Sequence, residues 1–179
     1  SAKNAIARLK AMKVSCGMLS GDQIQVVSNV ANELGLNDKS LIYGQTQPHE
    51  KQIVISQLRA EGNKVAMVGD GINDASALAW ADVSMALATG TDVAKSAADI
   101  VMVNPDINLV PAAIALSRAT LQTIHQNLFW AFAYNVIAIP LAAIGLFAEN
   151  GPLIASVAMG ASSITVVLRS AMLAKVKLN

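Results

Sequence analysis

The sequence predicts an α/β domain built on a parallel sheet, followed by a hairpin of two long apolar helices. Over residues 1–106, short strand patterns alternate with helical patterns, which is typical of βαβ units around a parallel sheet. The charge pattern changes after this region: residues 1–106 hold nine Lys/Arg and eleven Asp/Glu, whereas residues 107–179 hold four and one. The later region also contains two long runs without a charge, at 128–148 and 153–168.

The spacing of apolar residues predicts the elements of the α/β part. Helices are expected where apolar residues recur on one side, at Ala5, Leu9 and Met12, at Ile24, Val27, Val30 and Leu34, and at Ile53, Ile55 and Leu58. Gly35 and Gly62 are expected to end the second and third helices, and Pro48 fits the first turn of the third. Strands are expected in the uncharged runs 14–19, 41–43, 65–68, 83–86 and 100–103.

The composition excludes several kinds of site. The net charge of +1 gives no reason to expect nucleic-acid binding. The single cysteine, Cys16, excludes an internal disulfide and a cysteine-cluster metal site, and its apolar neighbours favour a buried strand thiol. The N-terminus has no signal-peptide core. It also lacks an initiator Met, so a fragment of a longer protein is expected.

The most informative string is Met67–Ala75, which reads Met-Val-Gly-Asp-Gly-Ile-Asn-Asp-Ala. It follows a predicted strand and precedes a predicted helix, so Asp70 is expected at the carboxyl end of a parallel strand, where open α/β sheets bind ligands. The two glycines allow a phosphate group to approach closely. Asp70 and Asp74, with Asn73 between them, offer hard oxygen ligands suited to Mg²⁺. The alternative is a solvated Asp-Gly turn in which Asp74 caps a helix, but the full string favours a metal.

This string resembles the magnesium-binding signature of P-type ATPases, which belong to the haloacid-dehalogenase superfamily. Further segments resemble motifs of the same family in the family's order: Met18–Asp22, Pro48–Lys51, and Thr89–Ala94 followed by Ala98-Asp99. The resemblance implies a haloacid-dehalogenase-like, Rossmann-like parallel sheet, with residues 1–106 forming the C-terminal part of a phosphorylation domain.

The resemblance also implies a role for each candidate residue. The implied catalytic residues are Ser20, Gly21, Asp22, Lys51 and Asn73, and the implied Mg²⁺ ligands are Asp70 and Asp74. The Ser20 hydroxyl would contact the phosphoryl group, and Lys51 would steady the charge of the phosphoaspartate. Taken alone, Ser20 could instead cap the helix that begins near Asp22, and Lys51 could be one surface lysine among several.

The chain departs from the family pattern at two positions and by two larger absences. Gln23 stands where the family usually has Asn, and Ser76 where it usually has Pro; both changes are mild. More seriously, the string Asp-Lys-Thr-Gly-Thr, which carries the phosphorylated aspartate, does not occur. The nucleotide-binding domain that normally follows that string is missing as well. The chain alone is therefore expected not to hydrolyse ATP through a phosphoenzyme.

The two uncharged runs predict membrane helices at 127–148 and 153–174, joined by an external turn at 149–152. Residues 107–126 are expected to form a linker helix and residues 175–179 a cytosolic tail. The positive-inside rule places both chain ends in the cytosol. The basic residues that flank the outer ends are Arg118, Arg169, Lys175 and Lys177. The alternative is a buried helical hairpin of a soluble protein.

Polar side chains inside a membrane helix are costly, so those within the predicted membrane helices indicate a functional site. Tyr134 and Asn135 lie in the first helix, and Met159 and Ser163 lie one turn apart in the second. A thioether is a soft ligand suited to Cu⁺. These residues resemble the last two helices of copper-exporting P-type ATPases, where they complete a Cu⁺ site with a Cys-Pro-Cys motif that this chain lacks. The alternative is that the serines and small residues serve only for close helix packing.

Together these resemblances imply the C-terminal part of a heavy-metal P-type ATPase of the Cu⁺-exporting subclass. In the intact pump, ATP is the substrate, Mg²⁺ the cofactor and Cu⁺ the transported ion. The expected partners are the N-terminal remainder of the pump, with its nucleotide-binding and actuator domains, and the lipid of a bacterial plasma membrane. Two alternatives stay open: a non-catalytic membrane fragment of a split or decayed pump, and a soluble haloacid-dehalogenase-type phosphatase.

Overall fold

The chain divides into two compact units, Ser1–Pro111 and Ala112–Asn179. The computed structural model describes residues 1–70, 72–87, 92–96, 98–145 and 150–174. The motif residues Gly71, Thr89, Gly90 and Thr91 lie outside the described residues, as does Glu149 of the predicted turn.

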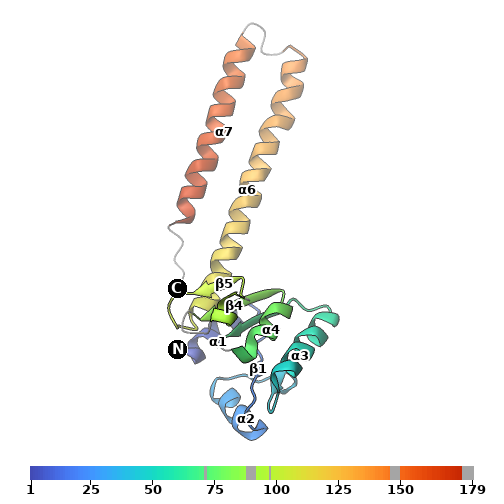
Figure 1. The fold of residues 1–179 in the computed structure, drawn as a ribbon. Helices are drawn as coiled ribbons and strands as arrows, with labels where there is room; N and C mark the ends of the chain where they lie inside the picture. The colour runs from blue at the N-terminus through green and yellow to red at the C-terminus, as the bar shows by residue number, and fades with distance from the viewer. Residues whose placement is uncertain (71, 88–91, 97, 146–149, 175–179) are drawn as a thin grey trace. The chain divides into compact units, whose positions relative to one another are not determined.

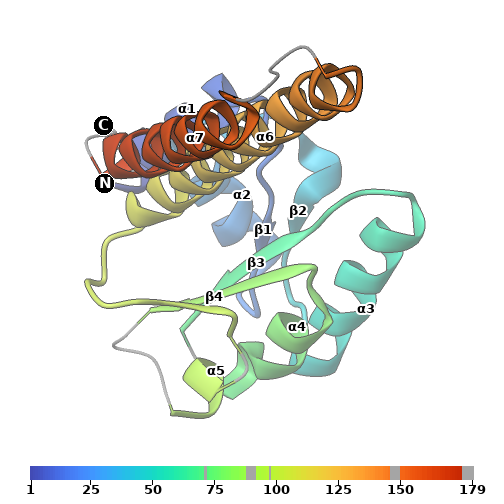
Figure 2. The same ribbon diagram turned by 90° about the horizontal axis from the view of Figure 1, so that it is seen from above.

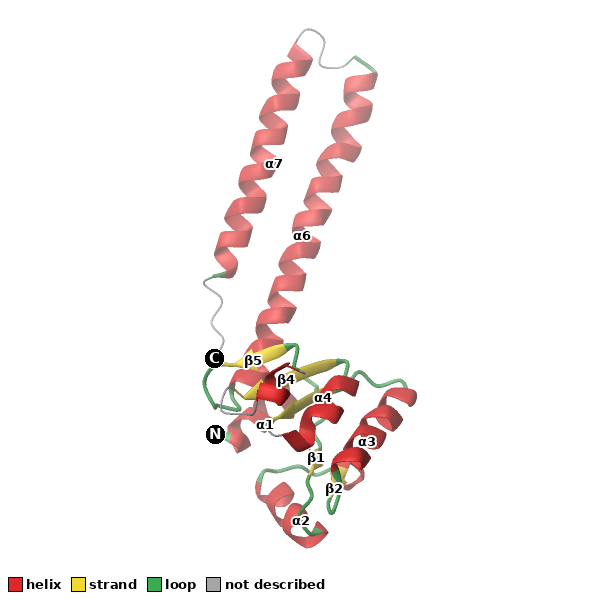
Figure 3. Ribbon diagram, viewed as in Figure 1, coloured by secondary structure: helices red, strands yellow, loops and turns green. Residues whose placement is uncertain are grey.

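Helices and strands alternate through the first unit, which confirms the α/β pattern predicted from the sequence (Figures 1 and 3). The strands are β1 (Met18–Leu19), β2 (Ile42–Tyr43), β3 (Ala66–Gly69), β4 (Val83–Leu87) and β5 (Ile100–Met102). The helices of this unit are α1 (Ala2–Ala11), α2 (Ile24–Glu33), α3 (Pro48–Ala60), α4 (Ala75–Trp80) and α5 (Asp92–Ser96), with short 3-10 helices η1 (Lys39–Leu41) and η2 (Ile72–Asp74). Two long helices follow, α6 (Leu109–Ala143) and α7 (Gly151–Leu173).

The strands are parallel, as predicted, but they form two separate sheets among the described residues. One sheet has the order β3-β4-β5, and the other pairs β1 with β2. The predicted strand at 14–19 is shorter than expected, because only Met18 and Leu19 have ladder partners, Ile42 and Tyr43. Cys16 therefore lies outside β1, where it is half-buried and not the fully buried strand thiol that the sequence predicted.

The core of the first unit lies between the sheets and their helices. Its buried apolar residues include Ala5, Val27, Ala31, Leu36, Ile55, Ala77, Leu78, Met85, Ala86, Met102 and Val110. Figure 2 shows α3 and α4 next to each other beside β3 and β4, and Arg59 of α3 donates to the carbonyl oxygen of Trp80 at 2.8 Å. The packing of α4 against α3 fixes the loop that follows β3, which is the loop that carries the candidate metal ligands.

Local signals explain where α2 and α3 begin and end. Pro48 occupies the first turn of α3, and the N–H of Gln47 donates to Glu50 at 2.7 Å, which satisfies one free backbone donor at the helix start. Gly35 and Gly62 have φ of 78° and 89° just beyond α2 and α3, a left-handed conformation that favours glycine. Both predicted helix ends are therefore confirmed.

The second unit is a pair of antiparallel helices, α6 and α7 (Figure 1). Near one end of the pair, Asn127 donates to Ser170 at 3.2 Å and Arg169 donates to Gln126 at 3.3 Å. The Arg169 guanidinium also lies 5.8 Å from the centre of the Trp130 ring. Among the described residues, no helix is both long enough and apolar enough to cross a membrane. The membrane spans predicted at 127–148 and 153–174 are therefore not confirmed.

Candidate functional site

The candidate magnesium ligands lie at the carboxyl end of β3, where the sequence predicts them. β3 ends at Gly69, Asp70 follows directly, and η2 then carries the chain to Asp74 and into α4. Asp70 is exposed, and its carboxylate has no hydrogen bond or ion pair among the described residues. Asn73 is exposed as well. This turn therefore presents one carboxylate and one amide to solvent at the strand end.

Lys51 and Asp74 form a buried ion pair at this site. The Lys51 Nζ lies 2.6 Å from the Asp74 Oδ1, and their side chains are only 11% and 14% exposed. Lys51 belongs to the face of α3 that also buries Ile55 one turn later. The alternative of a surface lysine is therefore wrong. Sequence reasoning missed the pairing, because Lys51 lies 23 residues before Asp74 and meets it only through the packing of α3 against α4.

Gly69 allows Asp74 to lie close to the strand end. A Cβ added at Gly69 would lie 2.7 Å from the Cβ and 2.9 Å from the Oδ2 of Asp74, which is closer than real atoms approach. One Asp74 oxygen therefore faces Lys51 and the other lies over Gly69. The Ser76 hydroxyl donates to the carbonyl oxygen of Pro48 at 3.2 Å, so a second contact holds the start of α4 against the start of α3.

Ser20 and Asp22 form a turn at the carboxyl end of β1. The Ser20 hydroxyl donates to the Asp22 carboxylate at 2.9 Å, and the Asp22 N–H donates back to the Ser20 Oγ at 3.2 Å. The helix after them begins at Ile24 with Gln23 as its N-cap, so the alternative of Ser20 as the cap of that helix is wrong. Thr46, which the sequence did not single out, is buried and donates its N–H to the Ser20 carbonyl at 3.0 Å.

The Ser20 turn and the Lys51–Asp74 pair occupy carboxyl ends of parallel strands in different sheets. No described contact joins Ser20, Gly21 or Asp22 to Lys51, Asp70 or Asp74. The structure thus brings Lys51 and Asp74 together and places the Ser20 turn at the equivalent edge of the other sheet.

The residues present fit a magnesium ion. Mg²⁺ is typically held by one or two carboxylates, with water and phosphate oxygens in its other positions. Asp70 and Asp74 are two carboxylates on one turn, and the exposed Asp70 is open to such partners. No group of three or more His, Cys, Asp or Glu side chains that could hold a metal occurs in the part of the chain that the structure describes.

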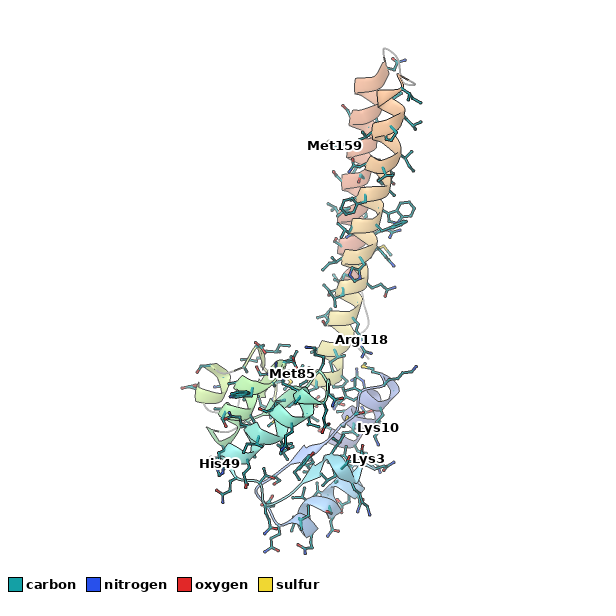
Figure 4. The ribbon with its side chains drawn as sticks, turned by 90° about the vertical axis from the view of Figure 1, so that its right-hand side faces the viewer. Lys3, Lys10, His49, Met85, Arg118 and Met159 are labelled. Atoms are coloured by element: carbon teal, nitrogen blue, oxygen red, sulfur yellow. The ribbon has the colours of Figure 1, made fainter. Side chains whose placement is uncertain are left out.

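No described contact brings the candidate copper ligands of α6 and α7 together. On α6, Asn135 donates to the carbonyl oxygen of Ala131 at 3.0 Å, and Tyr134 packs its ring 6.1 Å from that of Trp130. On α7, the Ser163 hydroxyl donates to the Met159 carbonyl at 3.1 Å, and Met159 is 75% exposed (Figure 4). The Asn135 amide and the Ser163 hydroxyl are therefore each engaged within their own helix, and the Met159 thioether is exposed.

Two aspartates at the amino ends of the strands have lowered pKa values. The Val65 N–H donates to Asp82 at 3.0 Å and lowers the pKa of that carboxyl, assisted by Lys64. The Ser84 N–H and hydroxyl each donate to Asp99 at 2.8 Å and lower its pKa. Both carboxylates tie neighbouring strands together at the end opposite the candidate site.

The chain is similar to known proteins in sequence and in fold. A family model described as haloacid dehalogenase-like hydrolase matches residues 1–82. The copper-exporting P-type ATPase of Staphylococcus epidermidis is 48% identical over 177 residues, and that of Staphylococcus aureus is 45% identical over the same length. These alignments cover 99% of this chain, which spans only about a fifth of the length of those relatives (22% and 21%).

A solved zinc-transporting PIB-type ATPase in its E2.Pi state is 30% identical, with a TM-score of 0.85 over 96% of this chain and 27% of that one. The catalytic domain of the CPx-ATPase CopB-B is 38% identical, with a TM-score of 0.58 over 64% of this chain and 44% of that one. The fold and site thus define a haloacid dehalogenase-like α/β domain. The chain is a homologue of the copper-exporting P-type ATPases.

Proposed function

We propose that the chain is the C-terminal part of a P-type ATPase that couples ATP hydrolysis to Cu⁺ transport across a bacterial membrane. The observation that carries this proposal is the 48% identity to a copper-exporting pump over 99% of the chain. The buried Lys51–Asp74 pair beside the exposed Asp70 supports it from the structure, since a phosphoryl-transfer site needs positive charge and a metal-binding carboxylate together.

The candidate residues of the first unit have separate roles in phosphoryl transfer. The Ser20 turn, with Gly21 and Asp22, contacts phosphoryl oxygens from one strand end, and Lys51 offsets their charge from the other. Asp70 and Asp74, with Asn73 beside them, are the side chains that would hold Mg²⁺. When bound, that ion supplies positive charge beside the transferred phosphate. The nucleophilic aspartate comes from another part of the intact pump, because Asp-Lys-Thr-Gly-Thr does not occur in this chain. The chain alone is therefore inactive.

In the same proposal, α6 and α7 form a membrane hairpin and contribute half of the Cu⁺ site. Large apolar side chains along both helices are more than 60% exposed, which is typical of surfaces that contact lipid or other helices. These side chains include Phe129, Phe132, Val136, Ile137, Ile139, Val157, Ile164 and Val167. Tyr134, Asn135, Met159 and Ser163 supply polar and soft ligands, of which Met159 is the exposed thioether.

A chimeric pump tests the proposal. The 177 aligned residues of the S. epidermidis copper exporter are replaced by the matching residues of this chain, and Cu⁺-dependent ATP hydrolysis is measured in membranes. The chimera should hydrolyse ATP in response to Cu⁺, whereas the isolated chain should not. Met159→Ala in the chimera should reduce turnover about tenfold or more at limiting Cu⁺, since one soft ligand is lost.

Matched controls separate the parts of the proposal. Met172→Ala changes another exposed methionine of α7 and should leave turnover unchanged. A chimera that folds in the membrane but never responds to Cu⁺ would contradict the transport function. A chimera in which Met159→Ala behaves like Met172→Ala would remove Met159 from the metal site and leave the family assignment untouched.

A further inference from the structure

Two polar contacts join α6 and α7 near the C-terminal end of α7. The Arg169 guanidinium donates to the side-chain oxygen of Gln126 at 3.3 Å, and the Asn127 amide donates to the Ser170 hydroxyl at 3.2 Å. The same guanidinium lies 5.8 Å from the centre of the Trp130 ring, and that residue is 41% exposed. Neighbouring residues of α6 thus meet neighbouring residues of α7 beside an aromatic ring. These five residues are called the Arg169 cluster.

The charge of Arg169 has no carboxylate to balance it within the two helices. Residues 107–179 contain a single acidic residue, Glu149, which precedes the start of α7, whereas Arg169 lies in the last turns of that helix. The partners that the structure shows for Arg169 are neutral, an amide oxygen and an indole ring. Because a half-buried cation is stabilised by an anion, the balancing negative charge must come from outside α6 and α7.

The open polar groups of the cluster are mainly hydrogen-bond donors. Arginine carries five N–H donors, and the described bond to Gln126 uses one of them. The Ser170 hydroxyl accepts from Asn127, and among the residues that the structure describes none accepts its proton. The Asn127 Oδ1, an acceptor, is buried. A positive charge with unused donors suits a phosphate group, whose oxygens accept several hydrogen bonds and match the guanidinium fork.

The cluster lies where the surface of α6 changes from polar to apolar. His125 and Gln126 are exposed polar residues, and directly after the cluster begins Leu128 is 51% and Phe129 65% exposed. An arginine beside a tryptophan at such a boundary is typical of the headgroup level of a membrane, where each side chain has a wet and an apolar part. The anion available at that level is the phosphate of a lipid.

From these observations we infer that the Arg169 cluster binds the phosphate of an anionic phospholipid such as phosphatidylglycerol. Arg169 supplies the charge and Ser170 a further donor, while Gln126 and Trp130 hold the guanidinium in place. Four Lys/Arg against one acidic residue in 107–179 favour an anionic headgroup over a zwitterionic one. The inference rests on the proposed membrane hairpin, because a lipid reaches the cluster only if the apolar parts of both helices lie in a bilayer.

The test measures lipid contact at Trp130 on the full chain in vesicles. Trp80→Phe is the background, so that Trp130 is the only tryptophan left. The vesicles contain equal amounts of phosphatidylcholine and phosphatidylglycerol, and only one of the two lipids is brominated in each set. Bromine quenches tryptophan fluorescence on contact, so the ratio of quenching in the two sets measures the preference for the anionic lipid. The background chain should prefer phosphatidylglycerol about fivefold, the effect of one basic residue at a membrane surface.

Three variants in this background locate the preference. Arg169→Gln should abolish it, since the charge is lost while a polar side chain remains to meet Gln126. Ser170→Ala removes a donor without changing the charge and should lower the preference about twofold or more; it also tests the site where Arg169→Gln fails to insert. Arg118→Gln is the matched control. It removes the same charge about two helical turns before Gln126, farther from the cluster than the Debye length of about 8 Å, and should keep the preference.

Each result decides a separate question. If neither brominated lipid quenches Trp130, the hairpin does not lie in the bilayer, and the membrane part of the proposed function fails together with the inference. If both lipids quench equally in the background chain, the inference is wrong and the hairpin stands. If Arg169→Gln keeps the preference as Arg118→Gln does, the anionic lipid binds elsewhere and the inference is wrong. If sodium phosphate removes the preference and sodium chloride of equal ionic strength does not, the cluster takes a soluble anion and the inference is wrong.

Discussion

At the scale of single residues, Asp99 shows how one carboxylate can organise a sheet edge. It stands directly before β5 and accepts from both the N–H and the hydroxyl of Ser84 in β4, each at 2.8 Å, while its own N–H donates to the Ser84 Oγ at 2.9 Å. Ser84 is only 3% exposed. These bonds favour the ionised carboxyl, so the pKa of Asp99 in the folded chain lies below its ordinary value.

The sign of this shift predicts how stability depends on pH. A carboxyl whose pKa is lower in the folded chain stabilises it above the ordinary carboxyl pKa, and that stabilisation is lost as pH falls toward the folded value. Asp99→Asn should therefore lower the thermal midpoint of the α/β unit by a few degrees at pH 7, and the difference from wild type should shrink by pH 3. Thermal unfolding followed by circular dichroism at both pH values measures this. Asp92→Asn, at an exposed carboxylate, is the control and should change neither thermal midpoint. If Asp99→Asn lowers the thermal midpoint equally at both pH values, the charge of Asp99 does not stabilise the fold.

At this scale, sequence patterns predict where functional residues lie when those residues belong to one segment of the chain. The string from Gly69 to Asp74 could be placed at a strand end, because a strand pattern precedes it and a helix pattern follows it. The partner of Asp74 could not be predicted, because Lys51 lies 23 residues earlier and meets Asp74 only through the packing of α3 against α4. Burial of a lysine depends on that packing as well, so composition and spacing leave it open.

At the scale of elements, α4 connects the core to the candidate site. It begins directly after Asp74, and within it Leu78 is among the largest fully buried side chains, 1% exposed. Leu78→Ala should lower the free energy of unfolding of the α/β unit by about 2–5 kcal/mol, because burial is lost and a cavity remains. Hydrogen exchange of the β3 and β4 amides measures the change. Val103→Ala, at a residue 82% exposed, is the control and should lower the free energy of unfolding by under about 0.5 kcal/mol. Equal losses of unfolding free energy in Leu78→Ala and Val103→Ala would contradict the importance of α4 packing.

The elements themselves could be predicted more closely than their pairing. The run at 83–86 lies within β4, and the helix beginning at Pro48 starts where expected. Two details differ. Ile53, assigned to the apolar side of α3, is 51% exposed, whereas Ile55 is buried. The strands also form two sheets, since the pairing of short strands depends on neighbours distant in the sequence, and no local pattern encodes which strand edges meet.

At the scale of the whole molecule, α6 and α7 expose many large apolar side chains. No described helix meets the requirements of a membrane span, yet the relatives are copper exporters by name and the exposed apolar side chains continue along both helices. The proposal of a membrane hairpin predicts that the full chain stays in the membrane pellet after carbonate extraction. Val136→Asp should release a large part of it, because an aspartate near the middle of a span costs about 2.5–3.5 kcal/mol.

Leu116→Asp is the matched control, since it places the same charge at another exposed apolar position of α6, before the predicted span. It should leave the chain in the pellet because the charge would lie in the aqueous linker, where it carries little cost. Release of the unmodified chain would contradict the hairpin. Equal release by both variants would show that the charge disturbs folding and not insertion, because only insertion depends on depth along α6. Retention of wild type and Leu116→Asp together with loss of Val136→Asp would therefore place the membrane around the second half of α6.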